Sequence, residues 1–448
     1  MGKKTLVYGM GLSGKGAARL LAAQKKELVL FDKNENIDME AVKAEIGIKD
    51  AFCITGSLKK EDLKDVETMV LSPGVSAFCE DAKMAAGAGV KISGEVEEAY
   101  KASKGRLIAI TGTNGKTTTT ALCGEIMKAA FDEVFVVGNI GRSYAQEALN
   151  TSEKSVTVAE ISSFQLETTD LFHPDVSAVL NLTPDHLDRH LTFENYAACK
   201  MRIALRQSAG EVCVINYDDE YLRSLAGDIT PKKIYFSMKP LKEGVYYDGG
   251  IIFYSDGRRT QEVIKREEIN LAGDHNIENV MAAAAISVSM GVSLDIIARV
   301  IRNFKAVEHR IEFTCEKKGV KYYNDSKGTN TDAAAKAVAA MTSPSILIAG
   351  GYDKGADFTD WIKGFGRKIK AMVLIGETAE RIRETAISSG FTDIYMAKDL
   401  EDAVRISAQL ADPGENVLLS PACASWDQFK NYEERGRLFK EYARALPD

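Results

Sequence analysis

The sequence of 448 residues lacks the cysteine patterns of small secreted proteins held together by disulfides and of small domains held together by zinc. Its seven cysteines are scattered and none forms a C-x-x-C pair, so neither a disulfide framework nor a zinc ribbon is indicated. No apolar run is long enough to span a bilayer. The start, Met1–Lys4, leads into a short apolar stretch broken by glycines and Lys15. We therefore expect a cytoplasmic protein without a signal peptide.

A basic excess is also missing. The chain carries 57 Lys+Arg against 64 Asp+Glu, a net charge of -7, which argues against a nucleic-acid or anionic-membrane binder. The balance does not exclude small anionic ligands, because a few lysines and backbone amides can hold a phosphate. With 45% hydrophobic and 27% charged residues the chain is a folded protein, and its length predicts three domains.

Short apolar strands alternate with helical patterns along the chain, which indicates parallel sheets covered by helices on both faces. We predict an α/β protein with a Rossmann-like domain at 1–93, a central P-loop ATPase-type domain with a mostly parallel sheet at 94–306, and a C-terminal Rossmann-like domain at 307–448. The turn-rich residues 218–271 are predicted to form a small antiparallel appendage of the central domain.

The first glycine motif is Gly9-x-Gly11-x-x-Gly14, which follows a strand and opens a helix. Asp32 ends the next strand, at the spacing expected for a ribose-binding acid. The motif predicts a nucleotide diphosphate at the helix N-terminus, but alone it also fits an NAD-dependent oxidoreductase or a purely structural turn. A second loop, Ser72–Val75, is either another backbone donor site or a simple turn.

A phosphate loop follows the strand at 106–110. Thr111–Thr118 contains Gly-Lys-Thr before a helix, so Lys116 can reach the β and γ phosphates and the Thr117 hydroxyl can bind Mg²⁺. Ile110 stands where the strict motif has its first glycine. The strand-to-helix context nevertheless predicts a protein that handles ATP.

Polar side chains end the next two strands. Glu160 and His186 are expected at the same sheet edge as the phosphate loop and are therefore candidate Mg²⁺ ligands. Alternatively, His186 is a structural residue held by hydrogen bonds. Its spacing from His190 also fits a pair of zinc ligands on a helix, although no third ligand is evident nearby. Lys200, in a helical run at 193–207, is by default a solvated surface lysine.

Three polar loops in the C-terminal block follow strands and predict one ligand-facing edge, although each singly fits an ordinary turn. They cover residues 324–330, 350–355 and 420–429, and His309-Arg310 precedes the first.

With these motifs assembled, the chain resembles the Mur ligase family over essentially its whole length. The run Thr111–Thr117 fits the family signature and accounts for the missing glycine, and residues 419–432 point to the branch that adds D-glutamate. Tyr432 and Trp426 depart from the Phe and Leu expected there. The resemblance implies an ATP-dependent ligase of peptidoglycan precursor synthesis that joins D-glutamate to UDP-N-acetylmuramoyl-L-alanine through an acyl phosphate.

The resemblance also implies substrate-binding roles, residue by residue. The nucleotide-sugar substrate is expected at Gly11, Leu12, Ser13, Asp32, Ser72, Gly74 and Asn139. The remaining substrate contacts, including those to D-glutamate, are expected at Lys327, Thr329, Lys354, Ser425 and Tyr432.

ATP and metal roles follow from the same resemblance. ATP is expected at Gly112, Thr113, Asn114, Gly115, Lys116, Thr117, Thr118, Asn279, Arg310 and Asp325. Two Mg²⁺ ions are expected at Thr117, Glu160, His186 and Lys200. Lys200 matches a lysine carbamylated by CO₂, and the catalytic set is Lys116, His186 and Lys200.

The expected partners are the two small substrates, UDP-N-acetylmuramoyl-L-alanine and D-glutamate. No nucleic-acid or membrane partner is expected, and the protein is expected to be a monomer. The main alternative is a sibling ligase that adds a different amino acid. An NAD-dependent oxidoreductase leaves the phosphate loop unused, and a regulatory P-loop ATPase predicts hydrolysis without small substrates.

Overall fold

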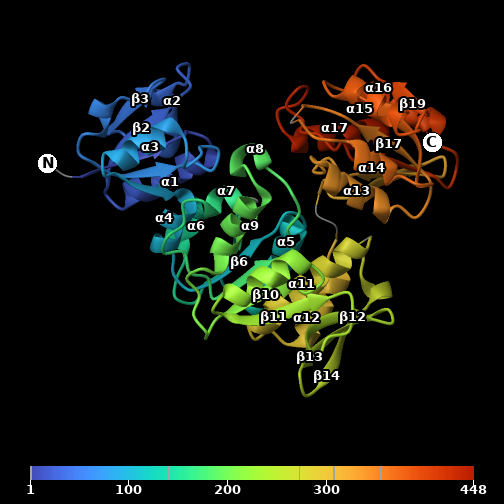
Figure 1. Ribbon diagram of the computed structural model, residues 1–448, viewed down its shortest axis with the longest axis horizontal. Coiled ribbons are helices and arrows are strands. Elements are labelled where there is room, and N and C mark those ends of the chain that lie inside the picture. The colour runs from blue at the N-terminus through green and yellow to red at the C-terminus, as the bar shows by residue number, and fades with distance from the viewer. Residues whose placement is uncertain (1–2, 140–141, 272, 306–307, 354, 448) are drawn as a thin grey trace. The chain divides into compact units, whose positions relative to one another are not determined.

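The computed structural model describes residues 3–139, 142–271, 273–305, 308–353 and 355–447 (Figure 1). These residues fall into two compact units. The first holds Met1–Ile269 and Glu278–Asn303, and the second holds Asn270–Ile277 and Phe304–Asp448. The first unit contains a five-stranded and a nine-stranded sheet, and the second contains a six-stranded sheet.

The five-stranded sheet is parallel throughout, in the order β3-β2-β1-β4-β5. Its strands are β1 (Lys4–Tyr8), β2 (Glu27–Asp32), β3 (Ala51–Thr55), β4 (Val66–Leu71) and β5 (Lys91–Gly94). Because the strand order reverses at β1, the loops after β1 and β4 open at the switch point where such sheets bind ligands.

The nine-stranded sheet has the order β14-β13-β12-β11-β10-β9-β6-β8-β7. The appendage is antiparallel from β12 to β14, as predicted, but β12 pairs in parallel with β11, so these strands extend the main sheet. The strands are β6 (Arg106–Thr111), β7 (Val134–Gly138), β8 (Val156–Glu160), β9 (Val176–Val179), β10 (Val212–Asn216), β11 (Lys232–Ser237), β12 (Glu243–Asp248), β13 (Ile251–Asp256) and β14 (Thr260–Lys265).

Helices surround both sheets of the first unit, and α1 packs against α4 and α6. They are α1 (Leu12–Ala23), α2 (Met39–Ile46), α3 (Glu80–Gly87), α4 (Glu95–Ala102), α5 (Lys116–Ala130), α6 (Tyr144–Glu147), α7 (Ser163–Leu166), α8 (Leu187–His190), α9 (Phe193–Met201), α10 (Glu220–Leu225), α11 (Asp274–Ser289) and α12 (Leu294–Asn303). Five 3₁₀ turns are η1 (Lys60–Leu63), η2 (Ala148–Asn150), η3 (Arg202–Ala204), η4 (Ala226–Asp228) and η5 (Arg266–Glu268). The first turn of α11 belongs to the second unit.

The six-stranded sheet has the order β15-β16-β20-β17-β18-β19 and is parallel except for β15. Its strands are β15 (Glu312–Lys317), β16 (Val320–Asn324), β17 (Ser345–Ala349), β18 (Ile369–Leu374), β19 (Ile394–Met396) and β20 (Asn416–Leu419). Its helices are α13 (Thr331–Ala340), α14 (Thr359–Lys363), α15 (Ala379–Ser388), α16 (Leu400–Leu410) and α17 (Tyr432–Ala445).

The predicted α/β class, with mostly parallel sheets between helices, is confirmed. Strand interiors such as Leu347 and Ile348 have no exposed surface, which accounts for their continuous apolar sequence. The seven cysteines are free thiols. Among helices of the described residues, none combines the length and apolarity needed to cross a bilayer.

A buried carboxylate ties α4 to the segment after α7. Glu97 has no exposed surface and accepts hydrogen bonds from the backbone N–H groups of Asp170, Leu171 and Phe172 at 2.9 to 3.2 Å. One side chain therefore fixes a turn whose amides have no strand partner.

Replacing this carboxylate should destabilise the first unit. We expect Glu97→Ala to lower the free energy of unfolding by about 3 kcal/mol, because the buried amide of Phe172 and the partly buried amides of Asp170 and Leu171 lose their acceptor. Urea unfolding measures the change. Glu125→Ala, which removes an exposed ion pair with Lys128 on α5, should cost less than about 1 kcal/mol. Equal losses in the two variants would contradict the role given to Glu97.

Candidate active site

The phosphate loop joins β6 to α5 in a shape that depends on glycine. Gly112 and Gly115 have φ of 147° and 84°, and Gly115 caps the N-terminus of α5. Asn181 fixes the loop from the next strand: the Asn114 amide donates to Asn181 Oδ1 at 2.8 Å, and Asn181 Nδ2 donates to the Asn114 carbonyl at 3.1 Å. The helix N-terminus behind this loop favours an anion.

Two lysines converge on the carbonyl oxygen of Gly112. Lys116 Nζ donates to it at 2.8 Å and to the Thr113 carbonyl at 2.9 Å, while Lys200 Nζ donates to it at 2.7 Å. Lys200 is only 2% exposed and lies 4.7 Å from the ring centre of Tyr196. Burial, and then the charge of Lys116, lower the pKa of Lys200 well below its usual value. The default expectation of a surface lysine is therefore wrong.

Glu160 lies at the end of β8 with almost no exposed surface. Asn139, which follows β7, donates from Nδ2 to Glu160 Oε1 at 2.9 Å, and its backbone N–H donates to the Glu160 carbonyl at 2.8 Å. Asn139, which the resemblance assigns to the substrate, thus also orients this carboxylate.

His186 adopts a left-handed backbone conformation, with φ 53°, at the start of α8. Its ring packs edge-on against Phe164, with ring centres 4.7 Å apart, and its Nε2 lies 3.7 Å from Asp185 Oδ2. His190 is instead buried, with Nε2 3.1 Å from Ser163 Oγ. Within the part of the chain that the structure describes, neither histidine belongs to a group of side chains spaced to hold a metal, so the zinc pair finds no support.

The donor set at this sheet edge fits Mg²⁺. Thr117, Glu160 and His186 follow the neighbouring strands β6, β8 and β9, and supply a hydroxyl, a carboxylate and an imidazole. Oxygen donors are the ligands that Mg²⁺ prefers. Lys200 offers a buried amine, which becomes an oxygen ligand only if it is modified.

The predicted nucleotide-sugar residues of the five-stranded sheet also share one edge. Asp32 Oδ2 accepts from the Met10 amide at 2.7 Å, and Ser72 Oγ donates to the Gly9 carbonyl at 2.7 Å, so both side chains shape the glycine loop. A Cβ at Gly14 would collide with the Gly9 carbonyl, which explains that glycine. The predicted residues at or after the ends of β1, β2 and β4 are Gly11, Leu12, Ser13, Asp32, Ser72 and Gly74.

In the second unit, Asp325 follows β16 and is buried. Its Oδ2 accepts from Ser420 Oγ at 2.7 Å and its Oδ1 accepts from the Ile311 amide at 3.3 Å. Burial raises the pKa of Asp325 to about 7. Arg310 Nε is buried and has no hydrogen-bond partner among the described residues, so it can donate to an anionic ligand.

The remaining predicted substrate residues that the structure describes follow β16 and β20: Lys327 and Thr329 lie in the loop after β16, and Ser425 and Tyr432, two of the residues expected around D-glutamate, lie after β20 and at the start of α17. Lys327 Nζ lies 5.3 Å from the ring centre of Tyr432, and the Thr329 amide donates to the Lys327 carbonyl at 2.9 Å. Ser425 is buried, and its carbonyl accepts from the amide of Phe429 at 2.8 Å. The structure thus gathers these residues in one unit. Lys354 lies outside the described residues.

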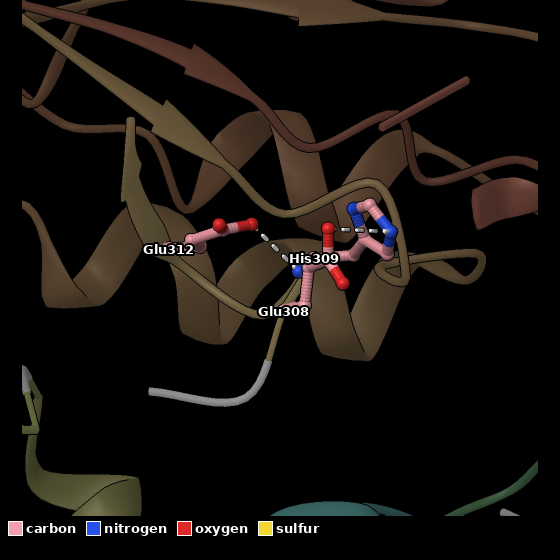
Figure 2. Close-up of side chains that lie close together, drawn as sticks. All are labelled: Glu308, His309 and Glu312. Carbon is pink, nitrogen blue, oxygen red and sulfur yellow. Dashed lines mark hydrogen bonds and ion pairs between the residues drawn. The ribbon is translucent and has the colours of Figure 1, made fainter. Parts of the chain in front are cut away.

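Glu308, His309 and Glu312 lie close enough together to suggest a metal site (Figure 2). Lys440, however, contacts Glu308 and lies 3.1 Å from Glu312, so an ammonium group already neutralises the carboxylates. The His309 amide donates to Glu312 Oε2 at 2.9 Å. The cluster is therefore an ion-paired brace for the backbone next to Arg310.

Sequence reasoning missed Arg435 of α17. Its guanidinium has no exposed surface and donates to the carbonyls of Ser326, Cys423 and Ala424 at 2.9, 3.1 and 3.2 Å. It thereby joins the loops after β16 and β20. The surrounding charged residues of the helix gave no signal that this arginine is buried.

Comparisons with known proteins agree with this architecture. Residues 3–94 match the Mur ligase MurD-like N-terminal domain, 110–287 the Mur ligase middle domain, and 309–423 the Mur ligase glutamate ligase domain. The UDP-N-acetylmuramoylalanine--D-glutamate ligase of Lachnoclostridium phytofermentans is 48% identical over 100% of this chain and 99% of the relative. The ligase of the same name from Lachnospira eligens is 48% identical over 99% of each chain. The chain belongs to the Mur ligase family.

Solved structures share the fold. UDP-N-acetylmuramate-alanine ligase MurC from Thermotoga maritima has a TM-score of 0.63 at 18% identity and covers 99% of each chain. The MurF ligase of the same organism, in complex with ADP, has a TM-score of 0.62 at 16% identity and covers 99% of this chain and 98% of that one. At these identities the likeness concerns the fold alone.

The raised pKa of Asp325 predicts a pH-dependent stability. Because its pKa is about 7 in the folded chain and about 4 when unfolded, the buried carboxyl costs stability progressively as pH rises between those values. Asp325→Asn should therefore stabilise the protein by roughly 2 kcal/mol more at pH 8 than at pH 5. Thermal unfolding at both pH values tests this, with Asp360→Asn on α14 as the exposed control. A pH-independent difference would contradict the buried acid.

Proposed function

We propose that the protein joins D-glutamate to the L-alanine carboxylate of UDP-N-acetylmuramoyl-L-alanine, using ATP and Mg²⁺. The observation that carries the proposal is the meeting of Lys116 and Lys200 at Gly112, beside Glu160 at the same edge of the sheet. The relatives whose names state this activity match the chain from end to end.

The residues support an acyl-phosphate route. The L-alanine carboxylate attacks the γ-phosphorus of ATP, the β–γ bond breaks, and ADP leaves. The amine of D-glutamate then attacks the acyl carbon, inorganic phosphate leaves, and the nitrogen loses its extra proton. Lys116 exchanges its carbonyl partners for phosphate oxygens and offsets the repulsion between the anionic reactants. Mg²⁺, when bound, adds positive charge at the same place.

Lys200 is proposed to act as a carbamate. Its buried amine, whose pKa is lowered well below its usual value, can in its neutral form add to CO₂ with loss of one proton to give an N-linked carboxylate, and it keeps one N–H for the Gly112 carbonyl. The modification turns a cation that would repel Mg²⁺ into an oxygen ligand that attracts it.

Each ligand is assigned to one domain, with boundaries proposed at 1–93, 94–306 and 307–448. The UDP group is assigned to the first domain, ATP and Mg²⁺ to the second, and D-glutamate to the third, which also carries Arg310 and Asp325, the residues that the resemblance assigns to ATP. Use of ATP and a UDP-linked precursor implies the cytoplasm. A monomer stays a prediction.

The reaction can be tested by phosphate release from purified protein. We expect release only when ATP, Mg²⁺, UDP-N-acetylmuramoyl-L-alanine and D-glutamate are all present. L-Alanine and meso-diaminopimelate in place of D-glutamate should give no release. Lys116→Ala should lose activity by at least about 100-fold, because the phosphate charge is no longer offset. Phosphate release without the UDP substrate would contradict the ligase, and activity with another amino acid would indicate a sibling ligase.

A separate experiment tests the carbamate. Lys200→Ala should lose at least about 100-fold in kcat, since an anionic ligand is removed. Added acetate or another short carboxylate should restore part of that activity by occupying the vacated space. Unchanged kinetics in Lys200→Ala would contradict the role of Lys200, and loss without rescue in a folded variant would contradict the carbamate.

A further inference from the structure

Arg189, on α8, contacts two loops that belong to different sheets of the first unit. Its NH1 donates to the Pro73 carbonyl at 2.6 Å and its NH2 donates to the Val75 carbonyl at 3.1 Å. These two carbonyls lie in the loop after β4, on either side of Gly74, which is expected near the diphosphate and sugar of the nucleotide substrate. Arg189, which follows a strand of the nine-stranded sheet, therefore holds the backbone of a candidate substrate loop that belongs to the five-stranded sheet.

The same guanidinium is paired with Glu167. Nε and NH2 donate to the two carboxylate oxygens at 2.8 and 2.7 Å, and the two side chains are 10% and 3% exposed. A guanidinium has five N–H donors, and these four hydrogen bonds use most of them. Arg189 has little capacity left for a phosphate, so its contacts indicate a positioning role.

A third contact leads to the candidate metal site. The guanidinium carbon of Arg189 lies 4.0 Å from the ring centre of Phe164, and that ring packs edge-on against His186 at 4.7 Å. Phe164 thus contacts both the arginine and the imidazole expected to bind Mg²⁺.

The backbone around α8 needs such a support. His186 and Leu191, at the two ends of this short helix, both have positive φ, of 53° and 69°. Residues other than glycine adopt this backbone conformation at a cost in free energy, so contacts with the surrounding structure must stabilise it. Arg189 supplies such contacts, and His190 supplies another through Ser163.

We propose that Arg189 is a positioning residue for the ligase reaction, which holds the Ser72–Val75 loop, and with it the UDP-linked substrate, in register with His186. This inference rests on the proposed function. Lysine keeps the charge but has no planar fork, so it cannot hold Glu167 and two carbonyls together. Arg189→Lys is therefore the informative variant.

The first measurement is the affinity for UDP-N-acetylmuramoyl-L-alanine by titration calorimetry, without ATP or Mg²⁺. We expect Arg189→Lys and Arg189→Gln to bind this substrate at least about tenfold more weakly than wild type, because charge-assisted hydrogen bonds to its loop are lost. Arg206→Gln is the control: Arg206 is also ion-paired in the first unit, to Asp170, although its side chain is 52% exposed, and this variant should bind the substrate like wild type.

The second measurement separates positioning from a general loss of structure. In steady-state kinetics, Arg189→Lys should raise KM for the UDP substrate by about tenfold and leave KM for D-glutamate within about twofold, since D-glutamate is assigned to the other unit. Glu167→Gln retains the arginine but removes its counter-charge, and should shift the same KM in the same direction.

The outcomes distinguish the two proposals. If wild type binds no UDP-N-acetylmuramoyl-L-alanine, the proposed function is wrong and this inference falls with it. If wild type binds the substrate, and folded Arg189→Lys or Glu167→Gln binds it equally well, the positioning role alone is overturned. An equal rise in every KM would indicate that Arg189 is purely structural, and the same loss of affinity in Arg206→Gln would show that the effect is not specific to Arg189. Either result would also overturn the positioning role.

Discussion

Two lysine amines meet at one oxygen atom, the carbonyl of Gly112, and the chemistry of the site depends on how the protein tolerates this. Burial drives Lys200 towards its neutral form, while Glu160 and Asp185 act against that shift. Lys116 rests against the carbonyls of its own loop. A bound polyphosphate therefore gives Lys116 strong anionic acceptors in place of weak neutral ones.

The loops that carry this chemistry are all placed by strand order. In each of the three sheets, polar loops follow the central strands, where the direction of chain winding changes. The strands behind them are apolar and buried, so the loops are anchored at their bases. A net charge of -7 therefore gave little guidance to the ligands. The important charges are a few cations at these loop positions, such as Lys116 and Arg310.

Sequence patterns predicted the site where each residue's role depends on its own strand or loop. Gly112, Lys116 and Glu160 are such residues, because an apolar run in the sequence predicts where a buried parallel strand ends and its polar loop begins. Asn181, Arg189 and Arg435 could not be predicted in this way. Their partners lie in loops that are distant along the chain, and only the tertiary fold brings those loops together.

The zinc alternative and the expected separate appendage differ from the structure for physical reasons. His186 and His190 are spaced like a zinc pair on a regular helix, but α8 is a single turn that begins in a left-handed conformation, and His190 bonds to Ser163. The β12–β14 strands were expected to stand apart, yet the parallel pairing of β12 with β11 merges them with the central sheet. Local patterns set the type of each element, whereas long-range pairing sets its neighbours.

The position of β20 has a consequence for how the protein is synthesised. β20 is the last strand of the chain, yet it lies between β16 and β17 in the middle of its sheet. Until the ribosome has released residues 416–419, the strands on either side have no shared partner, and α17 with its Arg435 emerges later still. The six-stranded sheet therefore cannot be completed before residues 416–419 have been synthesised, whereas the two sheets of the first unit are built from strands that emerge earlier. A chain that stops before residue 416 would leave β16 and β17 without the strand that lies between them, and such unpaired strand edges are sites of aggregation.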